Sequence, residues 1–506
     1  MTTPPIPDHS EAFWGPVLGN SHPEHHLADD HEVLVVGAGI VGLTTALLLA
    51  RRGVDVAVVD ASRPGSGTTS RSTAKATLLH GTLSGTIRRK HGADAVRHYV
   101  MANRSGQDLI RDTCDGVVDT QIRDSWTYAT TRKGADAVLQ EQEALAEAGL
   151  PAELAEPSEL PFATEAAVRL RDQLQINPSQ YLAALQAELV AMSVPIAWPY
   201  RVTGIDSHEG RLRATSTQGL STTARWIVLA TLLPFPLRTL MFATATPQRS
   251  YAMACRIESP LPLGMYLSAD SPTHSLRTGL SPSGEELLLV GGHGHPVGKK
   301  LPASQHLQGL ADWTHEQFGV REFTHRWSAQ DFRSSDSLPQ VGPSPLGPPR
   351  VLMATGFGKW GITNGSAAAQ ILAGYVTDEL PEWGRLYRPR ITSGLSGWRQ
   401  LVVQNADVAA HLAKGWLLEP RLATDGNAVR RDLPVPEAES TVDGVRRVCS
   451  AVCTHLGGIV RWNDAENSWD CPLHGSRFGP DGSVLSGPAT EPLRMIANGV
   501  SSGQRQ

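Results

Sequence analysis

The chain has 506 residues, of which 41% are hydrophobic and 19% charged, and its net charge is −5. This composition is typical of a globular protein, and at ~150 residues per domain the length predicts about three domains. No basic excess points to nucleic acid, and five cysteines exclude a disulfide-built secreted scaffold. The longest apolar stretch, residues 33–50, is interrupted by glycines and threonines, so no membrane span is predicted. Residues 1–29 show no secretory signal, and the expected compartment is the cytoplasm.

The first chemical signal is a glycine motif between a strand and a helix. Residues 33–36 form a short apolar run that predicts a buried strand. Three glycines follow with the spacing G-x-G-x-x-G: Gly37, Gly39 and Gly42. A helix is predicted over 43–52 and a strand over 54–59, with Asp60 at its end. The glycines permit a tight turn, close approach to a pyrophosphate and close helix packing, while the acid accepts from ribose hydroxyls. The order predicts a dinucleotide-binding fold; a glycine-rich turn in another β-α-β unit is the alternative.

Two later stretches favour FAD over NAD. A loop of small residues, 65–75, follows soon after Asp60 and contains the expected cofactor-binding residues Thr68, Thr69 and Lys75. Far downstream, a predicted strand at 351–354 leads into a second glycine-rich loop and a helix. The expected cofactor-binding residues there are Gly356, Gly358, Gly361 and Thr363. We expect Thr363 or Asn364 to cap this helix, whose N-terminus would stabilise negative charge on a reduced flavin.

These segments together resemble the D-amino-acid oxidase/glycine oxidase superfamily of FAD-dependent amine oxidoreductases. The resemblance covers residues 32–385 and is carried by 33–60, 65–75, 228–231 and 354–365, with a helix start at 177–182 and a return motif at 336–342. It implies an FAD domain assembled from separated segments, with a substrate domain inserted between them. Some members attach FAD through Cys or His in the glycine loops. Here those loops carry no cysteine, and Ser72 stands at the histidine position, which implies non-covalent FAD.

Two C-terminal loops each hold one cysteine and one histidine. The four residues are Cys453, His455, Cys471 and His474. The 15 residues between the loops predict a hairpin with its turn at 463–467, which brings the loops face to face. This pattern resembles a Rieske [2Fe-2S] centre, in which two thiolates bind one iron and two imidazoles the other. A Cys2His2 zinc site uses the same residue types and is the alternative. The remaining cysteines are predicted to be packing residues: Cys114, Cys255 and Cys449.

The C-terminal loops depart from the pattern of high-potential Rieske proteins. In those proteins the resemblance implies a disulfide between the loops, and its two positions are here Gly458 and Leu473. Phe478 replaces a tyrosine that donates to a cysteine sulfur, although Ser476 is retained. Fewer donors to the sulfurs destabilise the reduced cluster. We therefore expect a potential below that of the respiratory proteins, within the span of ~−150 to +300 mV.

The predicted fold class is α/β plus all-β. It comprises a Rossmann-type FAD domain, an inserted α+β substrate domain, a helical linker and a small C-terminal Rieske β domain. The linker contains a predicted amphipathic helix at 396–414, and the whole chain resembles a bacterial group of FAD-dependent oxidoreductases with a Rieske domain. The expected boundaries are 1–30 for an N-terminal tail, 31–85, 165–232 and 335–385 for the FAD-binding domain, 86–164 and 233–334 for the substrate domain, 386–425 for the linker, and 426–506 for the Rieske domain.

The two cofactors together indicate an oxidoreductase. A flavin accepts two electrons at once and an iron–sulfur cluster passes one at a time, which predicts a dehydrogenase coupled to a protein or quinone-like acceptor. The resemblance implies an amine or amino acid as the small-molecule substrate. The alternatives are an oxidase that uses O2 with an accessory cluster, and a non-catalytic electron carrier or redox sensor. No feature of the sequence specifies an oligomeric state.

Three residues of the glycine-rich loops are candidates for catalysis: Lys75, Lys359 and Trp360. Lys75 is expected near the isoalloxazine, where a cation would favour an anionic reduced flavin; a solvated loop lysine is the alternative. Trp360 is expected to line the substrate cavity or to pack in the core. His80 is predicted to end a core strand, and His293 and His295 to lie in a solvated turn.

Overall fold

The computed structural model describes residues 2–17, 27–235, 245–298, 301–345, 347–390, 427–430 and 435–496. The helix predicted at 396–414 lies outside these residues, as does most of the predicted linker. The chain forms two compact units, one of Met1–His295 with Gln305–Ile391 and the other of Pro296–Ser304 with Thr392–Gln506. In the part of the chain that the structure describes, no helix is long and apolar enough to cross a membrane.

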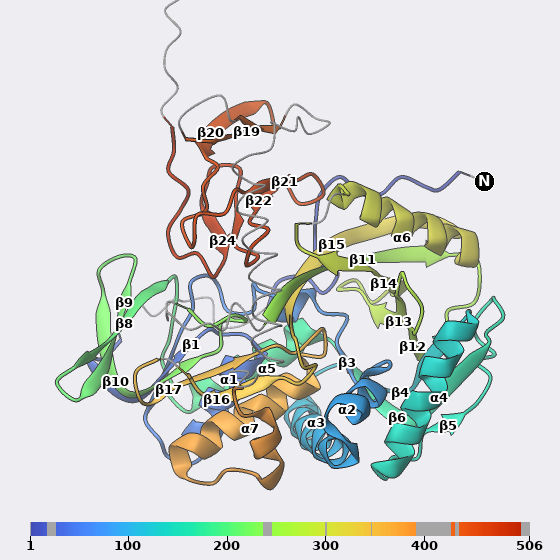
Figure 1. The fold of residues 1–506 in the computed structure, drawn as a ribbon, viewed down its shortest axis with the longest axis horizontal. Helices are drawn as coiled ribbons and strands as arrows, with labels where there is room; N and C mark the ends of the chain where they lie inside the picture. The colour runs from blue at the N-terminus through green and yellow to red at the C-terminus, as the bar shows by residue number, and fades with distance from the viewer. Residues whose placement is uncertain are drawn as a thin grey trace, which may run out of the picture. The chain divides into compact units, whose positions relative to one another are not determined.

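The first unit contains an eight-stranded sheet with a parallel centre (Figure 1). Its strands are β1 (Asp30–Val36), β2 (Val56–Val59), β7 (Ile196–Ala197), β8 (Val202–His208), β9 (Arg211–Ser216), β10 (Ser221–Leu229), β16 (Gln340–Pro343) and β17 (Val351–Thr355). The order is β16-β17-β10-β1-β2-β7, with β9 and β8 branching from β10. The strands from β17 to β7 are parallel. The strand order predicted around the first glycine motif is therefore present.

Both faces of β1 are buried, which explains its uninterrupted apolar sequence. Val33 and Val35 belong to a core cluster shared with the helices. Leu34 and Val36 belong to a second cluster, shared with residues of β8, β9 and β10. The helices that contribute to the first cluster include α1 (Ile40–Ala50), α3 (Ala93–Cys114), α5 (Pro178–Ala191) and α7 (Thr363–Thr377). Because successive side chains of a strand point to opposite faces, this alternation places β1 between two layers.

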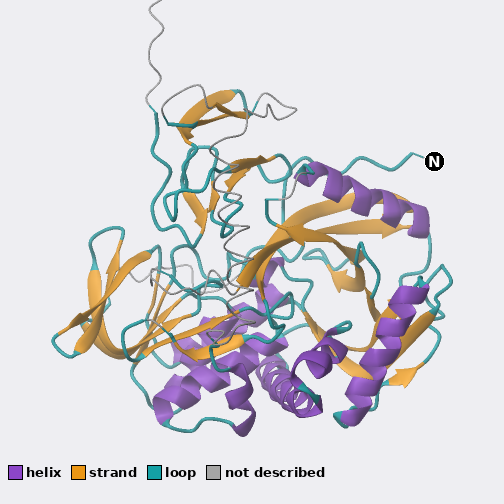
Figure 2. Cartoon of the chain, viewed as in Figure 1, coloured by secondary structure: helices purple, strands orange, loops and turns teal. Residues whose placement is uncertain are grey.

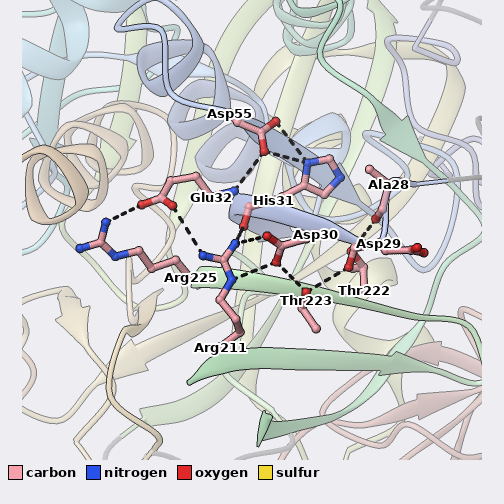
Figure 3. A network of polar contacts seen from close by, with 10 residues as sticks. All are labelled: Ala28, Asp29, Asp30, His31, Glu32, Asp55, Arg211, Thr222, Thr223 and Arg225. Carbon is pink, nitrogen blue, oxygen red and sulfur yellow. Dashed lines mark hydrogen bonds and ion pairs between the residues drawn. The ribbon is translucent and has the colours of Figure 1, made fainter. Parts of the chain in front are cut away.

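A polar network ties together the amino ends of β1 and its neighbours (Figure 3). Arg211 of β9 donates to both carboxylate oxygens of Asp30, at 2.9 and 2.6 Å, and to the carbonyl of His31 at 2.6 Å. The His31 ring lies 3.2 Å from the Asp55 carboxylate. A hydrogen bond from the Thr223 hydroxyl lowers the pKa of Asp30. Exposed ion pairs of this kind contribute little each, and this network lies at the opposite end of β1 from the glycine motif.

The first unit also contains a nine-stranded sheet. Figure 2 shows the strands of the chain in orange and the helices in purple. Its strands are β3 (Lys75–Ala76), β4 (Thr120–Ala129), β5 (Glu153–Leu154), β6 (Ala166–Ile176), β11 (Ala245–Ile257), β12 (Met265–Ser268), β13 (His274–Leu280), β14 (Glu286–Pro296) and β15 (Val320–Ser334). The remaining helices of the unit are α2 (Leu83–His91), α4 (Arg132–Glu147) and α6 (Ala303–Phe318), with 3-10 turns η1 (Thr69–Arg71) and η3 (Glu382–Tyr387). Two of these strands, β3 and β6, fall in ranges that the sequence assigned to the FAD-binding domain, and the structure pairs them in this sheet instead.

The N-terminal segment packs on the nine-stranded sheet. Phe13 and Trp14 are buried in a cluster with Trp327 of β15 and residues of β11 and β14. The Trp14 indole donates to the carbonyl of Ser72 at 2.8 Å, and the Arg277 guanidinium lies 5.0 Å from the same ring. Phe13 and Trp14, which the sequence analysis assigned to an N-terminal tail, thus pack in the core, and Trp14 lies beside the loop of residues 65–75.

The second unit contains two small antiparallel sheets. One consists of β18 (Ala428–Arg430), β19 (Glu437–Val442) and β20 (Val445–Ser450), and the other of β21 (Arg461–Asn463), β22 (Ser468–Asp470), β23 (Arg477–Phe478) and β24 (Val484–Ser486). The predicted hairpin is formed by β21 and β22. Trp469 and Phe478 are fully buried in its core. Cys449 lies buried on β20, as predicted for a packing residue.

Close packing between α3 and α7 depends on Gly106. A Cβ on Gly106 would overlap the carbonyl oxygen of Thr363 in the first turn of α7. We predict that Gly106→Ala destabilises the protein by about 2 kcal/mol, because overlap outweighs the higher helix propensity of alanine. Thermal melting of the holoprotein measures this effect. Gly204→Ala in β8 is the control, because a Cβ added there would meet no neighbouring atom within 4 Å, and it should melt like the wild type. Equal melting temperatures of the two variants would contradict the prediction.

Candidate functional site

The first candidate site lies at the carboxyl edge of the parallel strands. β1 pairs with β2 on one side and with β10 on the other, so the chain reverses its direction of winding at β1. In open α/β sheets, ligands bind outside the carboxyl ends of the strands at such a point. Residues Val36 and Val59 are register partners, as are Val36 and Leu229. The predicted loops after β1, β2, β10 and β17 therefore leave the same edge.

Gly37 and Gly42 have the conformations that the glycine motif predicts. Gly37 has φ +109, and a Cβ there would lie 2.5 Å from the carbonyl oxygen of Ala230. A Cβ on Gly42 would overlap the carbonyl oxygen of Gly37. No side chain caps the N-terminus of α1, where Gly39 is the N-cap. The start of α1 therefore has the backbone geometry of a phosphate-binding turn, and no side chain of the N-cap residue covers it.

Asp60 lies beside this turn. Its carboxylate accepts from the N–H of Ala38 at 2.7 Å and from that of Ser62 at 2.8 Å. Burial raises the pKa of Asp60, and the two backbone hydrogen bonds oppose that rise. The acid both stabilises the glycine turn and offers its remaining lone pairs to a ribose, so the predicted residue types fit the dinucleotide.

Thr68 and Thr69 connect the loop of residues 65–75 to α1 and to the nine-stranded sheet. The Thr69 hydroxyl accepts from the N–H of Ile40 at 3.3 Å, in the first turn of α1. The Thr68 hydroxyl donates to the carbonyl of Gln330 in β15 at 2.8 Å. The structure thus brings Thr69 to the start of α1, while Thr68 is bound to β15.

Lys75 lies on β3 and is buried, so the alternative of a solvated loop lysine is wrong. Its ammonium donates to the carbonyl of Tyr266 and to the hydroxyl of Ser275, both at 2.6 Å. Burial, and then the charge of Arg277, lower its pKa well below the ordinary value. Its nearest partners therefore belong to the nine-stranded sheet.

The second glycine-rich loop is held by the end of β15. The N–H of Lys359 donates to Asp331 at 2.5 Å, and the N–H of Gly358 donates to the carbonyl of Phe332 at 2.9 Å. Lys359 has φ +78, which a non-glycine residue adopts only where its surroundings hold it. Its exposed side chain places Nζ beside Gly294 in β14. Asp331 could not be recognised from the sequence, because its partner follows 28 residues later in another element.

The predicted capping of α7 is wrong. Ile362 is the N-cap residue, and no side chain caps the helix. The Thr363 hydroxyl instead donates to Asn103 of α3 at 2.7 Å, and the Asn364 amide donates to the Tyr99 hydroxyl at 3.0 Å. These side chains are used in the contact with α3. Gly365 leaves room for the start of α1: a Cβ there would lie 3.0 Å from Ile40.

The histidine predictions also need correction. His293 and His295 lie on β14, not in a solvated turn. The ring of His293 lies 3.3 Å from that of His274 between Nε2 atoms, and the ring of His295 lies 3.1 Å from the Tyr251 hydroxyl. His80 is buried in the loop between β3 and α2 rather than at the end of a strand. Residues far apart in the sequence make these contacts, which the H-x-H spacing does not encode.

The second candidate site consists of two loops with the same backbone hydrogen bonds. The N–H of Cys453 donates to the carbonyl of Gly458, and the N–H of Cys471 to that of Ser476, both at 2.8 Å. The N–H of Gly457 returns to the carbonyl of Cys453, and that of Gly475 to Cys471, both at 3.0 Å. Each loop thereby presents one cysteine and one histidine, and the cysteines at the two loop starts are buried.

Polar groups near the two sulfurs shift the pKa values of both thiols. Interaction with Cys471 lowers the pKa of Cys453 against the effect of burial, and the N–H groups of His455 and Leu456 and the Ser476 hydroxyl lower it further. Interaction with Cys453 and burial raise the pKa of Cys471, and the N–H groups of Leu473 and His474 oppose that rise. Donors of this kind favour the thiolate form that a metal requires.

The two imidazoles complete the donor set. The rings of His455 and His474 are 5.1 Å apart between centroids and nearly perpendicular. Burial lowers the pKa of both and brings that of His474 to about 4, so both are neutral and suitable as ligands. Among the described residues, no group of three or more His, Cys, Asp or Glu side chains is arranged to hold a single ion. The possible ligands are two thiols and two imidazoles, which is the ligand set of a two-iron Rieske cluster.

The departures from the high-potential pattern are visible around the loops. A Cβ on Gly458 would lie 2.6 Å from Leu473 and 3.1 Å from the Cys471 sulfur, so Leu473 fills the place of the missing disulfide. Phe478 is fully buried and brings no hydroxyl. The Ser476 hydroxyl also accepts from the N–H of Ala489 at 3.0 Å.

Comparison with known proteins identifies both parts of the chain. Residues 32–375 match the family model of the FAD dependent oxidoreductases, and residues 422–497 match the Rieske [2Fe-2S] domain. The chain belongs to the FAD dependent oxidoreductase family and carries a C-terminal Rieske domain. The cofactors are therefore FAD and a 2Fe–2S cluster, which confirms the predicted family, fold class and cofactors.

Relatives of full length and of known fold agree with this assignment. The chain is 32% identical to YhfW of Bacillus subtilis (strain 168), named as a Rieske 2Fe-2S iron-sulfur protein, over 92% of this chain and 93% of that protein. Its fold resembles glycine oxidase from Geobacillus kaustophilus, with TM-score 0.58, 17% identity, and 70% of this chain and 96% of that chain covered. It also resembles L-proline dehydrogenase from P. horikoshii, with TM-score 0.59, 18% identity, and coverage of 72% and 98%.

The cluster ligands can be tested against a cysteine of the same unit. We predict that Cys471→Ala and His474→Ala each abolish the Rieske electron paramagnetic resonance (EPR) signal of the dithionite-reduced protein and leave the FAD absorbance intact. Cys449→Ala is the matched control, since Cys449 lies buried on β20 and its thiol donates to the backbone carbonyl of Ala438 at 3.8 Å. A cluster signal that survives Cys471→Ala, or disappears in Cys449→Ala, would show that the ligands are assigned wrongly.

Proposed function

We propose that the protein is a dehydrogenase that oxidises an amine or amino acid and passes the electrons through its Rieske cluster to an external protein or quinone-like acceptor. When bound, FAD accepts a hydride from a C–H bond beside nitrogen, and the cluster passes electrons one at a time. The observation that carries the proposal is that one chain contains both an FAD dependent oxidoreductase domain and a Rieske domain. The names of the glycine oxidase and proline dehydrogenase that the fold resembles support an amino acid as substrate.

Lys359 is the residue to which we assign substrate binding. Its backbone is fixed by Asp331, and its Nζ lies beside Gly294 at the end of β14. Burial lowers the pKa of this ammonium, and the charge of Asp331 opposes that change. A positive charge there would form a charge-assisted hydrogen bond with a substrate carboxylate. We also assign Trp360, a partly buried residue, to the wall of the substrate cavity that the sequence predicts.

The role that we assign to Lys75, stabilising negative charge on the reduced flavin, requires its ammonium to be protonated. A cation near the reduced cofactor would stabilise negative charge, but burial among Tyr266, Ser275 and Arg277 opposes protonation. We also propose that FAD is bound without a covalent link, in which case acid precipitation releases all of the flavin into the supernatant.

Anaerobic reduction of the holoprotein by a panel of amines and amino acids tests the proposed reaction. We expect a subset of the panel to bleach the flavin absorbance and then to produce the Rieske EPR signal. In Cys471→Ala, the same compounds should bleach the flavin without that signal. Bleaching without an EPR signal in the wild type would favour an O2-using oxidase with an accessory cluster. No bleaching by any compound would favour an electron carrier or redox sensor.

The assignment of Lys359 predicts a change in substrate affinity. Lys359→Met should raise KM for a carboxylate-bearing substrate about tenfold and leave kcat nearly unchanged, since a charge-assisted hydrogen bond to bound substrate is lost. Lys133→Met, at an exposed position of α4, is the control. Steady-state kinetics with the best compound of the panel measure both. A KM equal to that of the control would remove Lys359 from the binding site.

A further inference from the structure

A buried chain of hydrogen bonds lies beneath the second glycine-rich loop. The Nε2 atom of His80 lies 2.8 Å from the carbonyl oxygen of Thr77, and its Nδ1 lies 2.7 Å from the Tyr99 hydroxyl. The Tyr99 hydroxyl accepts from the amide of Asn364 at 3.0 Å. His80, Tyr99 and Asn364 are each at most 2% exposed, so all of these contacts are shielded from water.

The chain continues through α3 and η3. The side-chain amide of Asn103 in α3 and the Tyr387 hydroxyl of η3 both donate to the side-chain oxygen Oδ1 of Asn364, at 3.2 and 3.0 Å. The side-chain oxygen Oδ1 of Asn103 accepts from the Thr363 hydroxyl at 2.7 Å. Four separate segments of the chain therefore meet at the first turn of α7.

The direction of each hydrogen bond fixes the state of His80. A carbonyl oxygen only accepts, so Nε2 carries the proton that is donated to Thr77. The Tyr99 hydroxyl already accepts from Asn364, so it donates to Nδ1, which must be unprotonated. Burial lowers the pKa of His80 to about 3, which agrees with a neutral ring. His80 thus has one tautomer and one orientation.

This fixed ring supports Trp360. The two rings are stacked, with centroids 4.2 Å apart and an interplanar angle of 17°. The Asn364 amide also donates to the Trp360 carbonyl at 3.0 Å. The network therefore holds Trp360 by its ring and by its backbone, directly before the first turn of α7.

We propose that His80 is a positioning residue for the cofactor, and that the chain Thr77–His80–Tyr99–Asn364 holds Trp360 and the first turn of α7 in the arrangement that sets the flavin potential. The proposal rests on the assignment of Gly356, Gly358, Gly361 and Thr363 to FAD. It does not depend on the substrate or on the acceptor. With FAD bound, the positive end of α7 would stabilise reduced flavin more than oxidised flavin, so a change in its position would alter the ratio of the two binding constants.

Two variants of the full-length holoprotein separate the hydrogen bonds from the stacked ring. Tyr99→Phe removes one hydroxyl, and with it the donor to His80 and the acceptor for Asn364. His80→Phe keeps a flat ring against Trp360 and loses the polar contacts of both ring nitrogens, which include one of Nε2 with the Thr363 hydroxyl at 3.3 Å. Tyr128→Phe is the control, because Tyr128 is an equally buried tyrosine on β4 whose hydroxyl has no hydrogen-bond partner among the described residues.

Spectroelectrochemical titration with dithionite gives the result, and the cluster in the same sample is the internal reference. We expect Tyr99→Phe and His80→Phe to change the ratio of FAD binding constants at least tenfold, which is about 30 mV in the flavin midpoint. The cluster midpoint and the flavin midpoint of Tyr128→Phe should stay at the wild-type values.

Flavin midpoints of Tyr99→Phe and His80→Phe that match the control would overturn the proposal. A shift of the cluster midpoint by the same amount would also overturn it, because the effect would then be general. If His80→Phe does not fold, Tyr99→Phe alone decides, since it preserves the ring and nearly all of the side-chain volume. Because dithionite replaces the substrate, a failure of the amine reaction leaves this test unaffected.

Discussion

Two helices begin side by side at the carboxyl edge of the parallel sheet, and their positive ends repel each other. α1 starts at Ile40 and α7 at Thr363, and a side-chain carbon on Gly365 would lie 3.0 Å from Ile40. The strand order β17-β10-β1-β2 requires this arrangement, because both helices leave the same edge. Neighbouring N-termini with partial positive charge are unfavourable unless an anion or other polar partner is close. The diphosphate of FAD supplies negative charge, and neither N-cap residue, Gly39 or Ile362, caps its helix with a side chain.

The protein holds the second helix in place without capping it. Asn103 and Tyr99 of α3 take up the side chains of Thr363 and Asn364, which in other helices would cap the first turn. Gly106 lets α3 approach the same turn. A buried polar network that is fully bonded specifies one arrangement, whereas a partly bonded network would cost stability. The start of α7 is thus fixed by α3 and by the contacts of its own first-turn side chains.

Local motifs could be predicted from the sequence, and tertiary partnerships could not. The glycine motif around Gly37 and the cysteine–histidine loops encode their own backbone geometry within six residues, so their spacing was sufficient. The matching hydrogen bonds of Cys453 to Gly458 and of Cys471 to Ser476 show why. By contrast, Asn103 and Tyr387 are 284 residues apart and meet only in the folded chain. The burial of Lys75, the strand position of His293 and the absent cap of α7 were missed for the same reason, since each depends on a distant element.

Transfer of electrons from the flavin unit to the cluster is tested most directly by a redox titration of the holoprotein that follows flavin absorbance and cluster EPR together. Ser476 is retained as a donor to the cluster, while Phe478 and the Gly458–Leu473 pair remove the features of high-potential relatives. We expect a cluster midpoint above the flavin midpoint and below roughly +200 mV, within the span of ~−150 to +300 mV. A cluster midpoint more than about 60 mV below that of the flavin, a tenfold unfavourable one-electron step, would contradict electron flow in this direction.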